Sequence, residues 1–217
     1  MFLLFLVSCA DKGSEEPHAA TLYDICDVAS DNGAAVFNLY RPDSDIPVVL
    51  TAPGKSLGEI EQGTSVVIAY RPEGGTPYVS DNISLITCRR INNLPLRVAE
   101  EAEDLAGWDR DPVELTSIWR GGGKIYMRLN LAYSDMPRRF SLVLDPETLE
   151  DAVPTAYLYH WRPDGGPDFM RQYYAAFDIA ALWERPETEG IRVIINNSSD
   201  PSLSTFVFSK GQPVSPE

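Results

Sequence analysis

The chain has 217 residues, 44% hydrophobic and 23% charged, which is ordinary globular composition with room for one large or two small domains. Its 32 Asp and Glu outnumber 18 Lys and Arg, for a formal net charge of -14. A chain this acidic repels phosphate backbones and anionic lipid surfaces, so we expect no nucleic acid partner.

The chain begins with an apolar run, residues 2–7, followed by Ser8 and Cys9. A run of this length cannot span a bilayer as a helix, which needs about 20 residues, but it fits the end of the apolar region of a secretory signal. The run lacks the Lys or Arg that opens such a signal. We therefore interpret residues 1–20 as a signal-peptide remnant followed by a polar tether.

The segment Leu6-Val7-Ser8-Cys9 resembles the lipobox of bacterial lipoproteins, whose cysteine thiol receives a diacylglycerol before the signal is cleaved. The resemblance implies lipidation of Cys9 and attachment to a membrane through the N-terminal lipid. We expect a lipid-anchored protein of the cell envelope, at the outer membrane on either its periplasmic or its surface-exposed face.

Residues 21–94 contain short runs of β-forming residues separated by turn residues such as Asp31-Asn32-Gly33. Five strands in about 70 residues suit a small closed barrel, of which the OB-fold is the commonest five-stranded form. The expected strands are Leu22–Val28, Ala35–Tyr40, Pro47–Thr51, Ser65–Arg71 and Ile83–Ile91.

Residues 95–111 are rich in Glu and Asp and poor in β-branched residues, which indicates an acidic linker with a single helical turn. Beyond it, residues 112–212 return to strand patterns. Ile125, Met127, Leu129 and Leu131 alternate with polar residues, and later segments repeat this period. Alternation of this kind favours an antiparallel β-sandwich. The fold class is thus all-β, an OB-like barrel followed by a sandwich.

Several segments resemble the NigD-like lipoproteins in their order along the chain. They are residues 63–70, Asp111-Pro112-Val113-Glu114-Leu115 followed by Trp119, Tyr157-Leu158-Tyr159-His160, and Ala176-Phe177-Asp178. The resemblance implies an OB-like domain followed by a β-sandwich, and Gram-negative envelope proteins associated with bacteriocin gene clusters. The chain departs from the family at residues 124–128, where we expect an asparagine early in the strand, and at Trp161, where a polar residue is commoner. The resemblance implies no catalytic residues.

The residues give little support to catalysis or metal binding. His160 is the only histidine outside the tether, and its alternation with Tyr159 and Trp161 favours a packed or surface position in a strand. Asp24, Asp27 and Asp31 are close in sequence, but their spacing does not match a calcium loop. We therefore expect no catalytic residues, no metal site and no cofactor.

Cys26 and Cys88 fall on the first and last expected strands of the barrel, which we take to be neighbours. An exported protein permits a disulfide between them, and two buried free thiols are the alternative.

All four tryptophans lie beyond the linker, close to several tyrosines. Such rings could serve as a contact surface for a sugar or a protein, or as core. The candidate binding aromatics are Trp119, Tyr126, Tyr159 and Trp161. We expect a non-enzymatic envelope lipoprotein that binds a protein or a glycan. The alternative is an envelope or surface glycan-processing enzyme that uses carboxylates the sequence does not single out.

Overall fold

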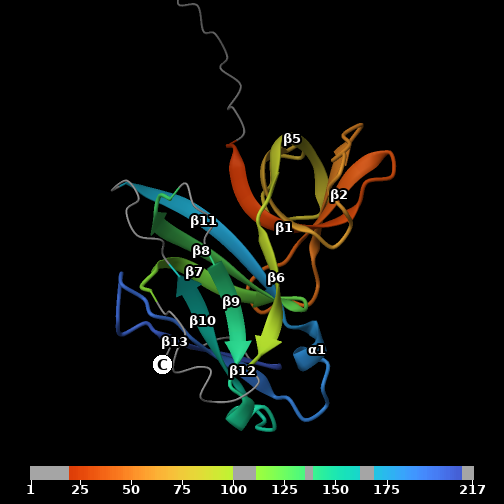
Figure 1. Cartoon of the computed structure of the whole chain (residues 1–217). Coiled ribbons are helices and arrows are strands. Elements are labelled where there is room, and N and C mark those ends of the chain that lie inside the picture. Colours follow the sequence, from red (N-terminus) through yellow and green to blue (C-terminus); the bar gives the residue numbers. More distant parts are fainter. Residues whose placement is uncertain (1–19, 100–110, 135–138, 162–168, 212–217) are drawn as a thin grey trace, which may run out of the picture.

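The computed structural model describes residues 20–99, 111–134, 139–161 and 169–211. The lipobox with Cys9, the tether and residues 100–110 of the expected linker lie outside the described residues. Two β bodies follow one another along the chain, a small barrel and a larger sandwich (Figure 1). The predicted all-β class, with a five-stranded barrel before a sandwich, is confirmed. The expected antiparallel pairing of the sandwich was wrong in part, because three strand pairs of its sheet are parallel, so the sheet is mixed.

The first body is a closed barrel with the strand order β1-β2-β3-β5-β4. Its inward side chains, among them Phe37, Leu50, Ile68 and Tyr70, form one apolar core. The strands are β1 (Leu22–Ser30), β2 (Ala34–Leu39), β3 (Val48–Pro53), β4 (Ser65–Pro72) and β5 (Asp81–Arg90).

The second body is an eight-stranded sheet that folds over on itself, in the order β13-β12-β10-β9-β6-β11-β8-β7. Side chains from both parts of the folded sheet enclose one core, as Leu129, Leu158 and Val193 illustrate. The strands are β6 (Asn92–Val98), β7 (Glu114–Gly121), β8 (Lys124–Ala132), β9 (Arg139–Leu144), β10 (Thr155–Trp161), β11 (Met170–Asp178), β12 (Gly190–Ile194) and β13 (Thr205–Ser209).

Strand β6 connects the two bodies. It begins two residues after β5 ends and then enters the second sheet, where it pairs in parallel with β11 and with β9. Residues 95–98, which the sequence analysis places in the acidic linker, are therefore part of a strand. Its alternating Leu94 and Leu96 pack against the sandwich core, and tertiary burial of this face outweighs the weak local pattern.

Helical structure is short. The helix α1 (Ala180–Trp183) follows β11, and the Asp178 carboxylate accepts a hydrogen bond from the Ala180 N–H at 2.9 Å. A 3-10 turn, η2 (Pro146–Thr148), precedes β10. Within the described ranges, no helix has both the length and the apolar character needed to cross a membrane.

Cys26 and Cys88 are both free thiols, so the disulfide that the sequence left open is not formed. Cys26 lies opposite Val66, and Cys88 lies opposite Ile68, so β4 separates the two cysteine strands. Strands two positions apart place their Cα atoms roughly 10 Å apart, beyond the limit of about 7 Å for a disulfide. The expectation that the first and last strands are neighbours was wrong, because β4 rather than β5 closes the barrel on β1.

Candidate functional site

The two bodies meet along a boundary that we call the seam, where β7, β8 and β11 of the sandwich lie against β1 of the barrel. The inner face of β8 carries Met127 and Leu129 into the sandwich core, as its alternation predicts. Its outer face is only partly exposed to solvent. Tyr126 is 1% exposed and packs with Ile25 of β1 and Ala176 of β11 at the apolar centre of the seam.

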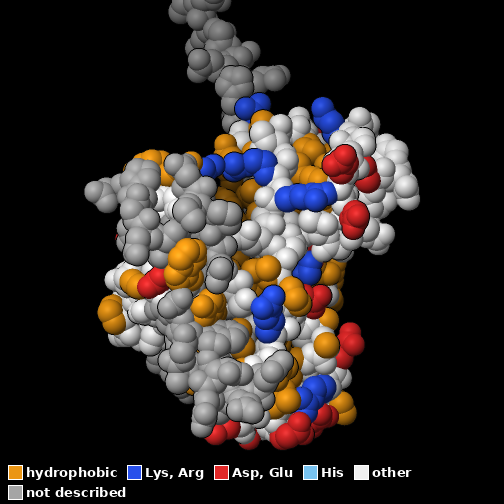
Figure 2. Space-filling view, in the orientation of Figure 1, with side chains coloured by type: hydrophobic (Ala, Val, Ile, Leu, Met, Phe, Trp, Pro, Cys, Tyr) orange, Lys and Arg blue, Asp and Glu red, His pale blue; other side chains and the backbone are white. Residues whose placement is uncertain are grey.

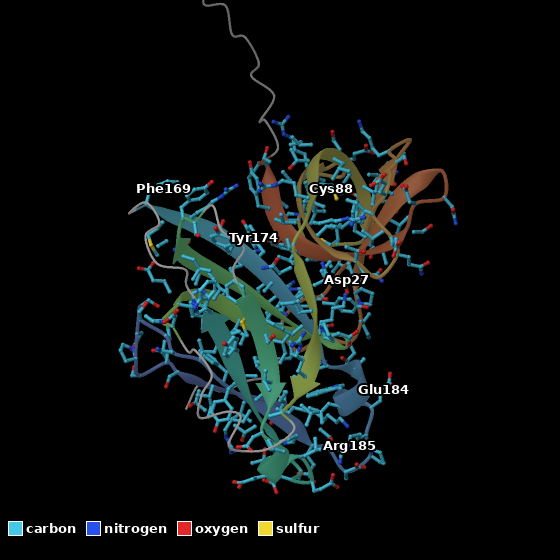
Figure 3. All side chains as sticks on the ribbon, in the orientation of Figure 1. Asp27, Cys88, Phe169, Tyr174, Glu184 and Arg185 are labelled. Atoms are coloured by element: carbon cyan, nitrogen blue, oxygen red, sulfur yellow. The ribbon has the colours of Figure 1, made fainter. Side chains whose placement is uncertain are left out.

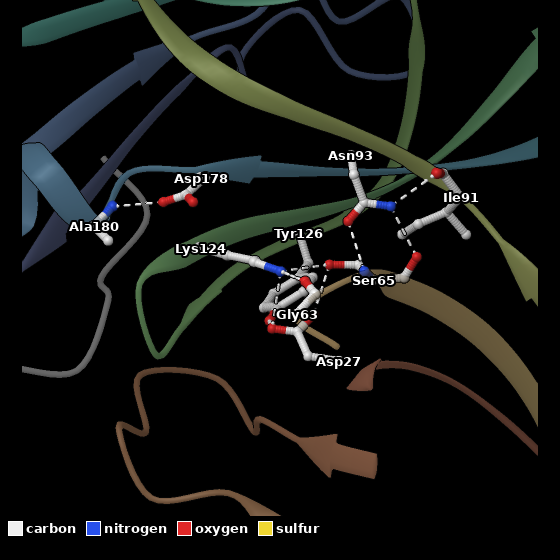
Figure 4. Close-up of polar contacts among 9 residues, drawn as sticks. All are labelled: Asp27, Gly63, Ser65, Ile91, Asn93, Lys124, Tyr126, Asp178 and Ala180. Carbon is white, nitrogen blue, oxygen red and sulfur yellow. Dashed lines mark hydrogen bonds and ion pairs between the residues drawn. The ribbon is translucent and has the colours of Figure 1, made fainter. Parts of the chain in front are cut away.

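A polar cluster beside this centre ties the two bodies together (Figure 4). The Lys124 ammonium group lies 3.1 Å from an Asp27 carboxylate oxygen and donates hydrogen bonds to the Gly63 carbonyl at 2.7 Å and the Ser65 hydroxyl at 3.0 Å. The Tyr126 hydroxyl donates to Asp27 at 3.0 Å. Burial and the adjacent Asp27 carboxylate raise the pKa of Tyr126, which keeps its hydroxyl a donor at neutral pH.

A second ion pair crosses the seam farther along β8. The Arg128 guanidinium lies 3.4 Å from the Asp24 carboxylate, which also accepts a hydrogen bond from the Tyr70 hydroxyl at 3.1 Å. Burial raises the pKa of Asp24, and the contacts with Tyr70 and Arg128 oppose that rise. The carboxylate is therefore held by partners from both bodies.

The turn between β7 and β8 is also fixed against the barrel. Arg120 is 3% exposed, pairs with Asp45 and donates to the Gly122 carbonyl at 2.9 Å. A Cβ atom on Gly121 would lie 2.4 Å from the Cβ of Tyr40, so this close approach requires glycine. The seam is thus packed or hydrogen-bonded from the β7–β8 turn to β11.

A cleft of about 360 Å³ opens on the seam beside β7, and we call it the aromatic cleft. The Trp119 ring stacks on Tyr126 with centroids 5.4 Å apart, and its indole N–H donates to the Tyr40 carbonyl at 3.3 Å. Two guanidinium groups lie over rings of this cleft, Arg128 at 5.6 Å from Trp119 and Arg41 at 5.5 Å from Tyr78. The residues that line it are Asp24, Leu39, Tyr40, Arg41, Pro42, Tyr78, Ser117, Trp119 and Arg128.

Tyr78 has a φ of 61°, in the left-handed region that a bulky side chain rarely adopts. Such backbone conformations cost about 1–3 kcal/mol and persist where the surrounding structure imposes them, often at ligand sites. The ring is 41% exposed, so this strained residue presents an aromatic face to solvent.

A second hollow, of about 800 Å³, lies where the end of β5 and the start of β6 face β11, and we call it the arginine groove. Tyr174, which packs against the apolar centre of the seam, also lines this groove, so the groove adjoins the seam (Figure 3). The described lining residues are Val67, Arg89, Arg90, Ile91, Asn92, Ser134, Arg171, Gln172, Tyr173 and Tyr174.

The four candidate binding aromatics fall in two separate places. Trp119 lines the aromatic cleft, while Tyr126 is buried, stacks on Trp119 and does not line the cleft. Tyr159 and Trp161 are half-buried on β10, and Tyr159 packs against the buried Val143. Within the described residues, Trp119 is thus the member of the set that reaches a cleft of the seam.

The other residues considered as catalytic or metal-binding candidates make structural contacts instead. His160 is 1% exposed, stacks on Phe140 with centroids 4.7 Å apart, and has its Nδ1 at 3.2 Å from the Asp111 carbonyl oxygen. Asp31 accepts hydrogen bonds from the Ser56 hydroxyl at 2.9 Å and the Leu57 N–H at 3.0 Å. Asp24 and Asp27 are used in the seam.

Sequence reasoning missed the residues that build the seam, above all Lys124, Arg128 and Asp27. The available signal was the polar face of β8, where Tyr126 stands between Lys124 and Arg128. A long cation on each side of a tyrosine is also common on a solvated strand, so this pattern alone does not indicate an interface.

No family profile matches the sequence, and no curated protein is similar to it at a significant level. Among solved structures, a NigD-like immunity protein from Bacteroides caccae is 19% identical with a TM-score of 0.57, and the match covers 91% of this chain and 92% of that one. This chain has the NigD-like fold. The resemblance to NigD-like proteins drawn from the short segments is confirmed at the level of fold.

Two further structures share the NigD-like fold. A protein of unknown function from Bacteroides vulgatus has a TM-score of 0.67 at 16% identity, with 91% of this chain and 96% of that chain covered. A candidate lipoprotein from Bacteroides fragilis has a TM-score of 0.57 at 12% identity, with 87% of this chain and 96% of that chain covered. The barrel and the sandwich therefore occur together, in this order, in several proteins.

Proposed function

We propose that this chain is a lipid-anchored protein of the cell envelope. It acts as a non-enzymatic binding module and contacts its partner at the seam. Cys9 carries the lipid, and residues 10–20 space the two β bodies from the membrane. The partner is a protein or a glycan, and the aromatic cleft is its contact site. The outer membrane is the proposed location.

The solved structures with this fold support the proposal. One is a NigD-like immunity protein, one a candidate lipoprotein from Bacteroides fragilis, and one a candidate toxin-related protein from Parabacteroides distasonis, with a TM-score of 0.58 at 16% identity. An immunity protein and a toxin-related protein among these structures favour a protein partner and an association of this chain with a bacteriocin-type gene cluster.

The observation that carries the proposal is the aromatic cleft itself. It combines the faces of Trp119 and Tyr78 with the guanidinium groups of Arg41 and Arg128, and both bodies contribute to it. Aromatic and arginine side chains in a concave, well-packed setting are the residues that dominate binding energy at interfaces. The seam holds Trp119 and Arg128 in place before a partner arrives, which lowers the entropy lost on binding.

The alternative, a glycan-processing enzyme, has less support. Hydrolysis of a glycosidic bond generally requires two carboxyl groups that flank the bond. Among the described residues that line the aromatic cleft, Asp24 is the one carboxylate, and it is paired with Arg128. The described lining of the arginine groove contains no Asp or Glu.

The anchor is tested by labelling cells that express the full chain with an alkyne-bearing fatty acid. We expect the protein to be labelled and to sediment with membranes. A Cys9→Ala variant should lose both properties. An unlabelled full-length chain, or a Cys9→Ala variant that still sediments with membranes, would overturn this part of the proposal.

The contact site is tested by a photoreactive benzoylphenylalanine placed in the cleft at Ser117 in expressing cells. A matched control carries it at the adjacent Thr116, which is exposed and does not line the cleft. We expect a discrete covalent adduct from position 117, weakened by Trp119→Ala, and none from position 116. Adducts of equal yield from both positions, or none from position 117, would contradict the proposed contact site.

A further inference from the structure

The arginine groove concentrates positive charge in a strongly acidic chain. Arg89, Arg90 and Arg171 line it and are all exposed, whereas the chain as a whole has a net charge of -14. Figure 2 shows Lys and Arg side chains across the boundary between the two bodies, while Asp and Glu gather at the outer side of the barrel and the far end of the sandwich. Distant carboxylates are screened beyond about 8–10 Å at physiological ionic strength, so these local cations set the charge that a ligand meets.

No ion pair within the described ranges involves Arg89, Arg90 or Arg171. Two of them are restrained in other ways, since Arg90 donates to the Glu59 carbonyl and Arg171 lies 5.9 Å from the Tyr133 ring centroid. Restrained side chains lose less conformational entropy when a ligand binds. The guanidinium fork is also the group best suited to carboxylates and sulfates.

The rest of the lining indicates a polar ligand. Asn92, Gln172 and Ser134 supply amide and hydroxyl groups, and Gln172 accepts a hydrogen bond from the Tyr174 hydroxyl at 2.6 Å. The centre of a protein interface usually requires an apolar anchor pocket, which this lining does not offer. Single-stranded nucleic acid requires exposed ring faces for successive bases, but Tyr173 and Tyr174 are half-buried.

We propose that the arginine groove binds an anionic glycan chain, whose carboxylate or sulfate groups pair with Arg89, Arg90 and Arg171. The amide and hydroxyl groups of the lining would then bind the sugar hydroxyls. This inference rests on the proposed binding function, and it adds a second contact site of defined chemistry at the other end of the seam from Trp119.

The test measures binding of fluorescent oligosaccharides to the full-length chain in nonionic detergent. The probes are an oligogalacturonate, its fully methyl-esterified form, which has the same sugars without charge, and a heparin oligosaccharide. We expect the carboxylated probe, the sulfated probe or both to bind, with affinity falling as salt rises, and the esterified probe not to bind. Which charged probe binds more tightly identifies the anionic group.

Arg89→Gln and Arg171→Gln should each weaken binding about tenfold, because each removes a charge-assisted hydrogen bond. Arg97→Gln removes an exposed arginine that does not line the groove and should change affinity less than twofold. Equal binding of the esterified probe, equal effects of Arg97→Gln and Arg89→Gln, or no binding of either charged glycan would overturn the inference. Tighter binding of polyglutamate or oligothymidylate than of both glycans would overturn it as well. The Ser117 adduct tests the proposed function separately, since position 117 lies outside this groove.

Discussion

Lys124 contacts groups from two barrel strands and from the turn before β4, at a point where an unpaired charge would be costly. Its ammonium group contacts Asp27 of β1, Ser65 of β4 and the Gly63 carbonyl, and the side chains of Lys124 and Asp27 are only 16% and 14% exposed. A buried charge is tolerated when it is paired and hydrogen-bonded, and removal of one partner leaves the other uncompensated.

We therefore expect Lys124→Met, which retains most of the apolar stem, to lower the free energy of unfolding by about 3 kcal/mol. Urea denaturation measures the change. The double variant Asp27→Asn with Lys124→Met should recover part of the loss, because it removes both charges. A Lys124→Met protein as stable as the wild type would show that the cluster contributes nothing to stability.

Asp24 predicts a pH dependence with an unusual sign. Its pKa in the folded protein is raised above the ordinary value of 3.8, mainly by burial, so the folded state binds the proton more tightly than the unfolded state. The contribution of Asp24 to stability is then complete below pH 3.8 and is lost as pH rises through its raised folded pKa. The stability of wild type relative to Asp24→Asn should fall across this window and then level off.

Asp200 provides a control of opposite sign. Hydrogen bonds from the Ser202 side chain and backbone lower the pKa of Asp200. The stability of wild type relative to Asp200→Asn should therefore rise as pH rises toward 3.8 and then level off. Urea denaturation of the three proteins from pH 3 to pH 7 measures both trends. A rise for Asp24 in the same direction as Asp200 would contradict the burial argument.

The two barrel thiols should be poor nucleophiles. Burial raises the pKa of Cys26 well above its ordinary range and that of Cys88 to about 11, and only the thiolate reacts. Iodoacetamide at pH 8 should alkylate both far more slowly in the folded than in the unfolded protein, with the partly exposed Cys88 reacting first. Peptide mapping by mass spectrometry measures this. A Cys26–Cys88 linked peptide, or rapid alkylation of Cys26, would be inconsistent with the barrel.

At the scale of elements, β8 shows which features an alternating sequence pattern predicts and which it does not. Its alternation correctly predicts a strand over Lys124–Ala132 and the residues of its core face. The same pattern leaves the opposite face unassigned, because polar residues alternate equally on a solvated strand and on an interface. The seam comes from the tertiary arrangement that brings β1 against this face, and no local spacing in the sequence encodes it.

The pairing of strand β6 and the closure of the barrel by β4 could not be predicted from the sequence for a related reason. Parallel pairing with two partners distant along the chain, Ala175–Asp178 and Leu142–Leu144, leaves no turn signal beside β6. Pro95 and the acidic residues that follow favour a linker locally. The position of β4 beside β1 likewise depends on topology. Strands with clear alternation and flanking turns, such as β8, were therefore predictable, whereas β6, the strand neighbours and the clefts were not.

The two faces of β8 can be compared with a matched pair of substitutions. Leu129→Ala should lower the free energy of unfolding by about 2–5 kcal/mol, because Leu129 is fully buried in the sandwich core. Asn130→Ala, one residue along on the outer face and partly exposed, should change it by no more than about 0.5 kcal/mol. Chemical denaturation measures both. Equal losses would mean that β8 has no distinct core face.

At the scale of the whole molecule, the barrel and the sandwich have separate cores that are joined by the seam. Separate cores normally allow domains to unfold independently. Here three ion pairs, among them that of Arg120 with Asp45, and the buried Tyr126 cross between them. The aromatic cleft and the arginine groove both draw residues from the two bodies, so binding at either depends on the seam holding the bodies together.

Differential scanning calorimetry tests this coupling most directly. We predict a single unfolding transition for the wild-type chain, with equal calorimetric and van't Hoff enthalpies. Ala176→Arg, which forces a charge into the apolar centre of the seam, should separate this transition into two. Two resolved transitions in the wild-type protein would contradict the account, because the two bodies would then not form one unit.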